Sequence, residues 1–139
     1  MEASDLSLLF RNKAGQLRAD TAGFLRMHWT SHLRTLADTQ AMFASISAAL
    51  LARGWSKVLI NQVDMQPFLP TEQQWITQEW LPQAVQQAGY RYGAVLVSTD
   101  IFTRLATAYI TTSVADLPLR YRSFDQEQAA VAWLRQQPG

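Results

Sequence analysis

Two short apolar runs in the second half of the chain constrain the fold most strongly. Residues 57–63, KVLINQV, and residues 94–97, AVLV, each contain consecutive apolar side chains. Because neighbouring side chains of a strand point to opposite faces, an unbroken apolar run needs cover on both faces of its sheet. One helical segment joins the two runs, so we predict that the strands near residues 57–63 and 93–98 are adjacent and parallel at the sheet centre.

The first thirty residues show a different pattern, with the short apolar or alternating segments LSLLF, QLRA and FLRMHWT separated by the turns NKAG and DTAG. Tight Gly-containing loops between short strands predict antiparallel hairpins. From there the helical and strand patterns alternate in the order β-β-β-α-β-α-β-α-β-α. The predicted fold class is therefore α/β, a mixed sheet in which an N-terminal antiparallel meander is followed by β-α units, with helices packed on the sheet.

Helix ends and helix faces can also be predicted. Thr71 with Gln74, and Asp125 with Gln128, have the spacing of capping boxes. Pro82 lies inside the second helical segment and is expected to kink or split it. In the last helix, Trp133 and Leu134 are predicted to be buried against the sheet.

The helix that follows Asp100 has an apolar stripe at helical spacing. We predict that this stripe faces the sheet and that Asp100 is its N-cap. The residues of this predicted inward face are Phe102, Leu105, Ala106, Tyr109 and Ile110.

Size and composition limit the class of protein. A chain of 139 residues is expected to form a single domain over 1–139. The net charge of +1 argues against a bulk attraction to nucleic acid, and the absence of cysteine removes disulfides and thiolate chemistry. No apolar run approaches the ~20 residues of a membrane helix, and the acidic start has no signal-peptide core. We therefore expect a cytoplasmic protein without membrane insertion.

Several stretches together resemble a protein family. These are the opening meander, the strand KVLINQVD, the segment LPTEQQWITQEWLPQA and the ending FDQEQAAVAWL. The chain is similar in these core positions to the bacterial STAS/SEC14-like domain proteins with a SpoIIAA-like fold, over nearly its whole length. The resemblance implies a STAS-like fold and a non-enzymatic regulatory or protein-interaction module, because the best-understood relatives are binding proteins switched by serine phosphorylation.

One departure from that family concerns the phospho-switch. The relatives carry a serine-containing turn after the central strand, whereas the corresponding stretch here reads QVDMQPFLP and has no serine or threonine before Thr71. The chain is therefore predicted to lack the serine switch. The lipid-carrier side of the resemblance implies an alternative, binding of an apolar small molecule or lipid, and a small hydrolase-type enzyme is the third class considered.

Polar residues after the two central strands form the candidate ligand or partner cleft. The carboxyl ends of parallel strands are the usual place for a ligand crevice in an α/β sheet. Carboxylates there can act in acid–base chemistry, but Asp100 also suits an N-cap and Asp64 a turn. The predicted cleft consists of Asn61, Asp64, Thr99, Asp100 and Arg104.

A metal site is not predicted. His28 and His32 are the only histidines, and a zinc ion usually takes three or four protein ligands. The pattern places His28 on the open side of a strand and His32 in a loop. We therefore predict no metal and no cofactor, and no catalytic residue is assigned.

The segment from Phe68 to Trp80 is the candidate interface for a homodimer or another protein partner. A helix turns by ~100° per residue, so Trp75 is expected to point away from the apolar face that carries Trp80. A tryptophan among polar neighbours often marks an interface. The alternative is that the kink at Pro82 rotates the first half of the helix and packs Trp75 beneath the preceding loop.

Overall fold

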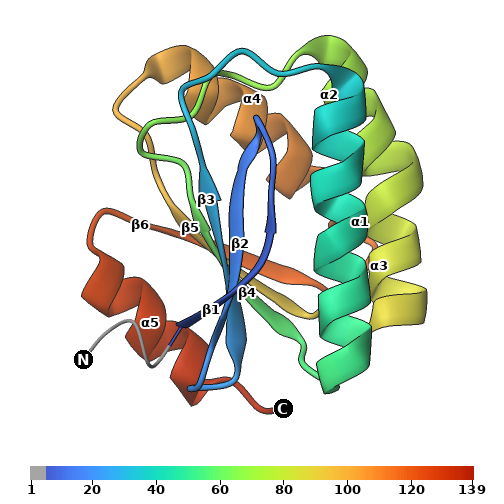
Figure 1. Cartoon of the computed structure of the whole chain (residues 1–139), viewed down its shortest axis with the longest axis vertical. Coiled ribbons are helices and arrows are strands. Elements are labelled where there is room, and N and C mark those ends of the chain that lie inside the picture. The colour runs from blue at the N-terminus through green and yellow to red at the C-terminus, as the bar shows by residue number, and fades with distance from the viewer. Residues whose placement is uncertain (1–5) are drawn as a thin grey trace.

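The computed structural model describes residues 6–139 and shows one mixed sheet whose strand order follows the sequence (Figure 1). The described strands are β1 (Leu6–Arg11), β2 (Gly15–Asp20), β3 (Phe24–Trp29), β4 (Lys57–Asn61), β5 (Tyr92–Leu96) and β6 (Arg120–Phe124). Strands β1, β2 and β3 pair antiparallel, and β3 through β6 pair parallel. The predicted fold class is confirmed. Residues 1–5, part of the stretch in which no signal peptide is predicted, lie outside the described residues.

The two apolar runs occupy the interior of the sheet, as predicted. Strand β4 lies between β3 and β5, and β5 lies between β4 and β6. Val58 belongs to one apolar core and Leu59 to a second core on the other side of the sheet. The unbroken run is explained by this cover on both faces.

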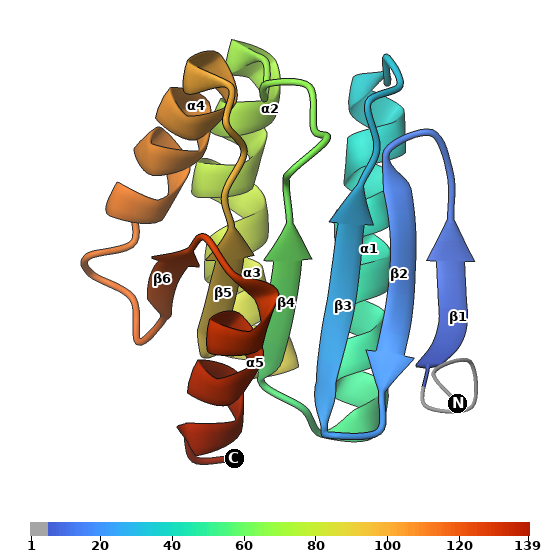
Figure 2. The same ribbon diagram turned by 90° about the vertical axis from the view of Figure 1, so that its left-hand side faces the viewer.

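Helices are distributed unequally over the two faces (Figure 2). The crossover helices α1, α2, α3 and α4 lie on one face, and α5 lies on the other, over β4, β5 and β6. The helical elements are α1 (Leu36–Arg53), α2 (Pro70–Trp75), the π-helical turn η2 (Ile76–Trp80), α3 (Leu81–Ala88), α4 (Ile101–Thr112) and α5 (Glu127–Gln136). The larger core fills the space under the crossover helices, and the smaller core lies under α5.

The helical segment between β4 and β5 contains Pro82 and remains helical throughout, because α2, η2 and α3 follow one another without a gap. The π-helical turn η2 precedes the proline, and the Leu81 N–H bonds back to the Ile76 carbonyl. Pro82 has no N–H, so the wider turn accommodates a residue that a regular helix interior disfavours. The expected disturbance at Pro82 is therefore present as a local change of helix type.

Two predicted capping boxes are wrong. Helix α2 begins at Pro70, and the Glu72 carboxylate accepts the Leu69 N–H at 2.7 Å. Helix α5 begins at Glu127, and its N-cap Gln126 makes no side-chain cap bond. Both segments contain more than one residue that can start a helix, so the local pattern alone does not fix the first residue. At α2 the deciding contact is an ion pair of Glu72, described below.

Gly93 is required by the packing of two tyrosines above β5. A Cβ atom built on Gly93 lies 2.2 Å from the Tyr121 ring and 2.6 Å from the Tyr90 hydroxyl. Both tyrosines are held by the core and by their mutual hydrogen bond of 3.1 Å, so the rings have little freedom to move away.

Replacement of Gly93 with Ala is expected to lower the free energy of unfolding by about 1–3 kcal/mol, because the added methyl overpacks the site. The midpoint of urea unfolding measures this loss. The double variant Gly93→Ala with Tyr121→Leu has no Tyr121 ring for the added methyl to meet. Its loss of stability should therefore be smaller than the sum of the losses of the two single variants. Additive losses would contradict the proposed clash.

Candidate functional site

The predicted cleft residues do gather at one edge of the sheet. Asn61 ends β4 and pairs with Leu96 at the end of β5, so the segments that follow both strands leave the sheet at the same edge. Thr99 and Asp100 follow β5, and Arg104 lies in the first half of α4. The sequence prediction that these residues share the carboxyl edge is in agreement with this register.

The polar groups at this edge serve local structure. The Asn61 side-chain oxygen accepts the Val63 N–H at 3.0 Å. The Asp100 carboxylate accepts the Thr103 N–H at 2.9 Å, so Asp100 is the N-cap of α4 as predicted. These are the bonds of an Asx-type turn and a helix cap. They do not by themselves create a reactive group.

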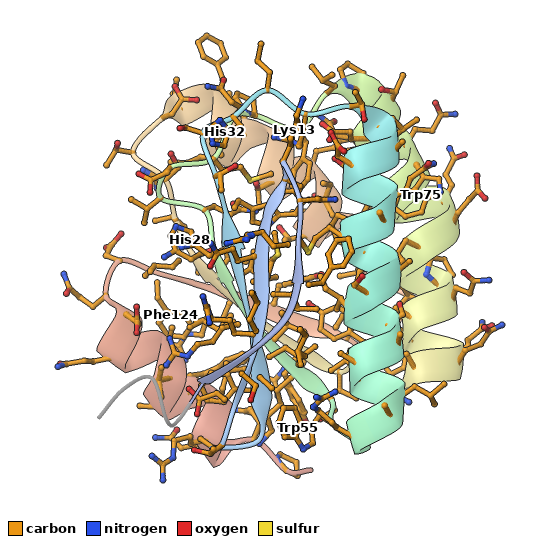
Figure 3. All side chains as sticks on the ribbon, in the orientation of Figure 1. Lys13, His28, His32, Trp55, Trp75 and Phe124 are labelled. Atoms are coloured by element: carbon orange, nitrogen blue, oxygen red, sulfur yellow. The ribbon has the colours of Figure 1, made fainter. Side chains whose placement is uncertain are left out.

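The remaining carboxylate of the cleft, Asp64, faces His28. The His28 Nε2 atom lies 3.6 Å from the Asp64 Oδ2 atom, and the two side chains are 52% and 64% exposed. Figure 3 shows His28 on β3, at the open side of the sheet, and His32 above it, in the loop that follows β3. Within residues 6–139, no group of three or more His, Asp or Glu side chains is placed to hold a metal ion.

The candidate interface from Phe68 to Trp80 needs correction. Phe68 is 6% exposed and Trp80 is 5% exposed, so neither contributes to an exposed patch. Trp75 is half-buried and packs edge-on against Phe43 of α1, with the ring centres 6.0 Å apart. Figure 3 shows Trp75 beside α1.

The π-helical turn and α1 explain the burial. Bonding between residues five apart in η2 brings Trp75 and Trp80 closer to one side than regular α-helical spacing would. Helix α1 then covers that side, and Phe43 packs against both indoles. The Trp80 indole N–H donates to the Phe43 carbonyl at 3.0 Å and to the Ser47 hydroxyl at 2.8 Å.

Helix α4 is rotated by about a quarter turn from the orientation that its apolar residues suggest. Ala106 and Ile110 are buried as predicted, but Phe102, Leu105 and Tyr109 are 68%, 61% and 58% exposed. The side turned to the protein interior carries threonines instead. We define the α4 outer face as the exposed residues Ile101, Phe102, Leu105 and Tyr109.

Two hydrogen bonds hold the threonine side inward. The Thr103 hydroxyl donates to the Met65 carbonyl at 3.1 Å, and the Thr107 hydroxyl donates to the Gln62 side-chain oxygen at 2.9 Å. Both acceptors lie in the segment that follows β4. Because α4 has apolar residues on two sides, its periodicity alone does not determine which side is buried, and these bonds do.

A small cavity lies under the threonine side of α4, between the helices and the sheet. Its volume is about 40 Å³. Aromatic rings of Trp29, Phe43 and Trp80 form part of the wall, and Gln62, Thr107 and Tyr121 contribute polar groups. Thr107 and Thr111 line the cavity from α4.

A buried ion pair was not predicted from the sequence. The Arg34 guanidinium makes two hydrogen bonds to Glu72, from Nε to Oε2 at 2.8 Å and from Nη2 to Oε1 at 3.0 Å. The side chains are 4% and 2% exposed. The Thr39 hydroxyl and the Leu69 N–H also donate to the carboxylate, and the guanidinium lies over the ring of Trp29.

This network joins the start of α1 to the start of α2. Its polar atoms are paired with one another and with the Gln66 and Pro67 carbonyls. The only local signal for it is an acidic residue at the third position of α2, where it can accept the backbone N–H before the helix. The partner is 38 residues earlier, which local patterns do not reveal.

Within residues 6–139, no helix is both long enough and apolar enough to span a bilayer. In comparisons with protein families, with curated proteins and with solved structures, nothing matches this chain.

Proposed function

We propose that this protein is a non-enzymatic regulatory module that binds a protein partner through the α4 outer face. The observation that carries the proposal is the exposure of four large apolar side chains on one side of a single helix. At ~100° per residue, Ile101, Phe102, Leu105 and Tyr109 fall within about 100° of the helix circumference. They therefore form one stripe along α4 rather than scattered apolar points.

Such a stripe is unusual for a surface without a partner. Monomeric proteins rarely expose contiguous apolar patches larger than a few hundred Å², and larger ones mark contact surfaces. Two of the four residues are aromatic, and Phe and Tyr are enriched at the centres of protein interfaces. The spacing of Ile101, Leu105 and Tyr109, four residues apart, suits a groove or a second helix.

The carboxyl edge supports an enzyme less well. Asn61 and Asp100 are engaged in a turn and a helix cap, and Asp64 lies in an exposed pair with His28. The STAS-like phospho-switch also has no hydroxyl to act on between Gln62 and Pro70. The proposal is therefore a binding protein of STAS-like organisation that works without that switch.

The test compares a double variant, Leu105→Glu with Tyr109→Glu, with the control Leu51→Glu. Leu51 is 66% exposed, but it lies on α1, outside the α4 outer face. Proteins that co-purify with the wild type from the cells that produce it are identified, purified and titrated calorimetrically against all three proteins. Sedimentation of each protein alone measures its oligomeric state and so tests for a homodimer.

We expect the double variant to weaken partner binding, or self-association, by at least tenfold and the control to bind as the wild type does. The two introduced carboxylates stay hydrated while the α4 outer face is free, but an interface formed there would have to desolvate them, which is unfavourable. Equal binding by all three proteins, or a wild type that neither self-associates nor binds a partner, would count against the proposal.

The second candidate function is binding of an apolar small molecule or lipid. The cavity beneath α4 favours it, because its wall is mainly aromatic and aliphatic. At about 40 Å³ the cavity is much smaller than the ~300–1,000 Å³ of typical small-molecule pockets. Carriage of a whole lipid is therefore the less supported form of this function.

A further inference from the structure

We propose that the cavity beneath α4 is a binding site for a small, neutral, mostly apolar molecule that carries a carbonyl oxygen. This inference sharpens the second candidate function and does not depend on a protein partner at the α4 outer face. Three features of the cavity support it: an amide donor without a protein acceptor, an uncharged wall, and one side closed by a helix with small inward side chains.

The amide donor belongs to Gln62. Its side chain is 3% exposed, lines the cavity, and accepts the Thr107 hydroxyl through Oε1. Within the described part of the chain, the Nε2 group donates no hydrogen bond to a protein acceptor. An amide nitrogen is a donor with two N–H groups, so Nε2 can donate to a ligand oxygen in the cavity that Gln62 lines.

A phenol supplies a second donor. The Tyr90 hydroxyl donates to the Tyr121 hydroxyl at 3.1 Å, and both rings line the cavity. Burial raises the pKa of Tyr90 well above its usual value of 10.0 and that of Tyr121 to about 12. Both phenols are protonated at neutral pH, so the proton of Tyr121 remains available to an acceptor. Together with the Gln62 amide, the Tyr121 hydroxyl suits a ligand that carries an acceptor oxygen.

The wall determines the charge of the ligand. Among the described residues, no Asp, Glu, Lys, Arg or His side chain lines the cavity. A charged ligand would leave water without a counter-charge, which is strongly unfavourable. The rings of Trp29, Phe43 and Trp80 suit a flat apolar body. A ketone, ester or amide on an aromatic ring meets these conditions, whereas a carboxylate does not.

Binding requires the cavity to widen, and α4 is the side that can yield. An aromatic ring needs roughly 150 Å³, as apolar cavities that accept benzene show, compared with about 40 Å³ here. The inward side of α4 has one large apolar residue, Ile110, beside Thr103, Ala106 and Thr107. Loops join α4 to β5 and to β6, as Figure 2 shows. A shift of α4 outward therefore breaks few apolar contacts, and it also stretches the hydrogen bonds from Thr103 to Met65 and from Thr107 to Gln62.

The test is an NMR titration of the purified protein with three probes of similar size. Acetophenone has the ring and the carbonyl, ethylbenzene lacks the acceptor, and benzoate is charged. We expect acetophenone to shift the Gln62 side-chain N–H signals and the backbone signals near Tyr90, Tyr121 and Thr107. Ethylbenzene should bind about five- to tenfold more weakly, because it leaves the donors unpaired, and benzoate more weakly still.

Variants locate the donor. Gln62→Leu should remove the preference for acetophenone over ethylbenzene, while the control Gln83→Leu, at an exposed position of α3, should retain it. Because the wild-type signals locate the probe, the result does not depend on the folding of Gln62→Leu. Equal binding of the three probes, no binding at millimolar concentration, or shifts confined to other surfaces would overturn the assignment. Binding of decanoate without acetophenone would overturn it in favour of acyl-chain carriage.

Discussion

Replacement of Glu72 with Gln is expected to lower the free energy of unfolding by about 3–5 kcal/mol, because it leaves a buried guanidinium without a counter-charge. The carboxylate takes four donors, two from Arg34, one from Thr39 and one from the Leu69 backbone. Glutamine keeps the size of the side chain but not the charge. Its NH₂ group, itself a donor, would replace a carboxylate oxygen that accepts hydrogen bonds from these groups. Against a typical total stability of ~5–15 kcal/mol this is a large loss.

Urea unfolding of the variant and two controls measures the effect. Glu79→Gln changes an exposed glutamate of the same helical segment and should alter stability by less than ~0.5 kcal/mol. The double variant Arg34→Met with Glu72→Met removes both charges and should be more stable than Glu72→Gln alone, because no unpaired ion stays buried. A midpoint for Glu72→Gln equal to that of Glu79→Gln would show that the ion pair is not needed for folding.

Truncation of Trp133 to Ala is expected to cost about 3–5 kcal/mol of stability. Trp133 is 9% exposed and contacts Tyr92 and Phe124, with ring centres 6.1 and 5.9 Å apart. Within residues 6–139, α5 is the one helix on the face of the sheet opposite to α1, α2, α3 and α4. The Trp133 indole therefore covers β5 where no second helix packs beside it.

The urea midpoint of Trp133→Ala is compared with that of Trp55→Ala, which removes a half-buried indole from the connection between α1 and β4. Trp55 packs at the edge of the larger core, so its loss should be clearly smaller. Trp133→Phe should retain most of the stability, because a ring still covers the strand. An unchanged midpoint for Trp133→Ala would show that α5 is peripheral to the fold.

The cleft residues illustrate how far a sequence argument extends toward a site. Asn61, Thr99 and Asp100 could be placed at one edge because the ends of parallel strands coincide there, and the register confirms it. Their hydrogen-bond partners, Val63 and Thr103, are two to three residues away, within range of a local prediction. The α4 outer face and the cavity beneath the same helix were not predicted.

The failure at α4 has a specific physical cause. Phe102, Leu105 and Tyr109 have the spacing of a buried stripe, and Thr103 and Thr107 have the spacing of a solvated one. The structure reverses the two because acceptors on Gln62 and Met65, 45 and 38 residues away, pair with the threonine hydroxyls. A pattern of polarity does not record where such acceptors lie.

The sequence by itself determined the class and order of the elements and the two central strands. Periodicity and runs of apolar residues are local properties, which can be recognised within one segment without knowledge of the segments that pack against it. Tertiary structure alone decided the inward side of α4, the packing of Trp75 and Trp80 against α1, and the start of α2. Each of these depends on a contact between distant segments: Thr107 with Gln62, Trp80 with Phe43, and Glu72 with Arg34. The free energy of such contacts arises only once the sheet has brought the segments together.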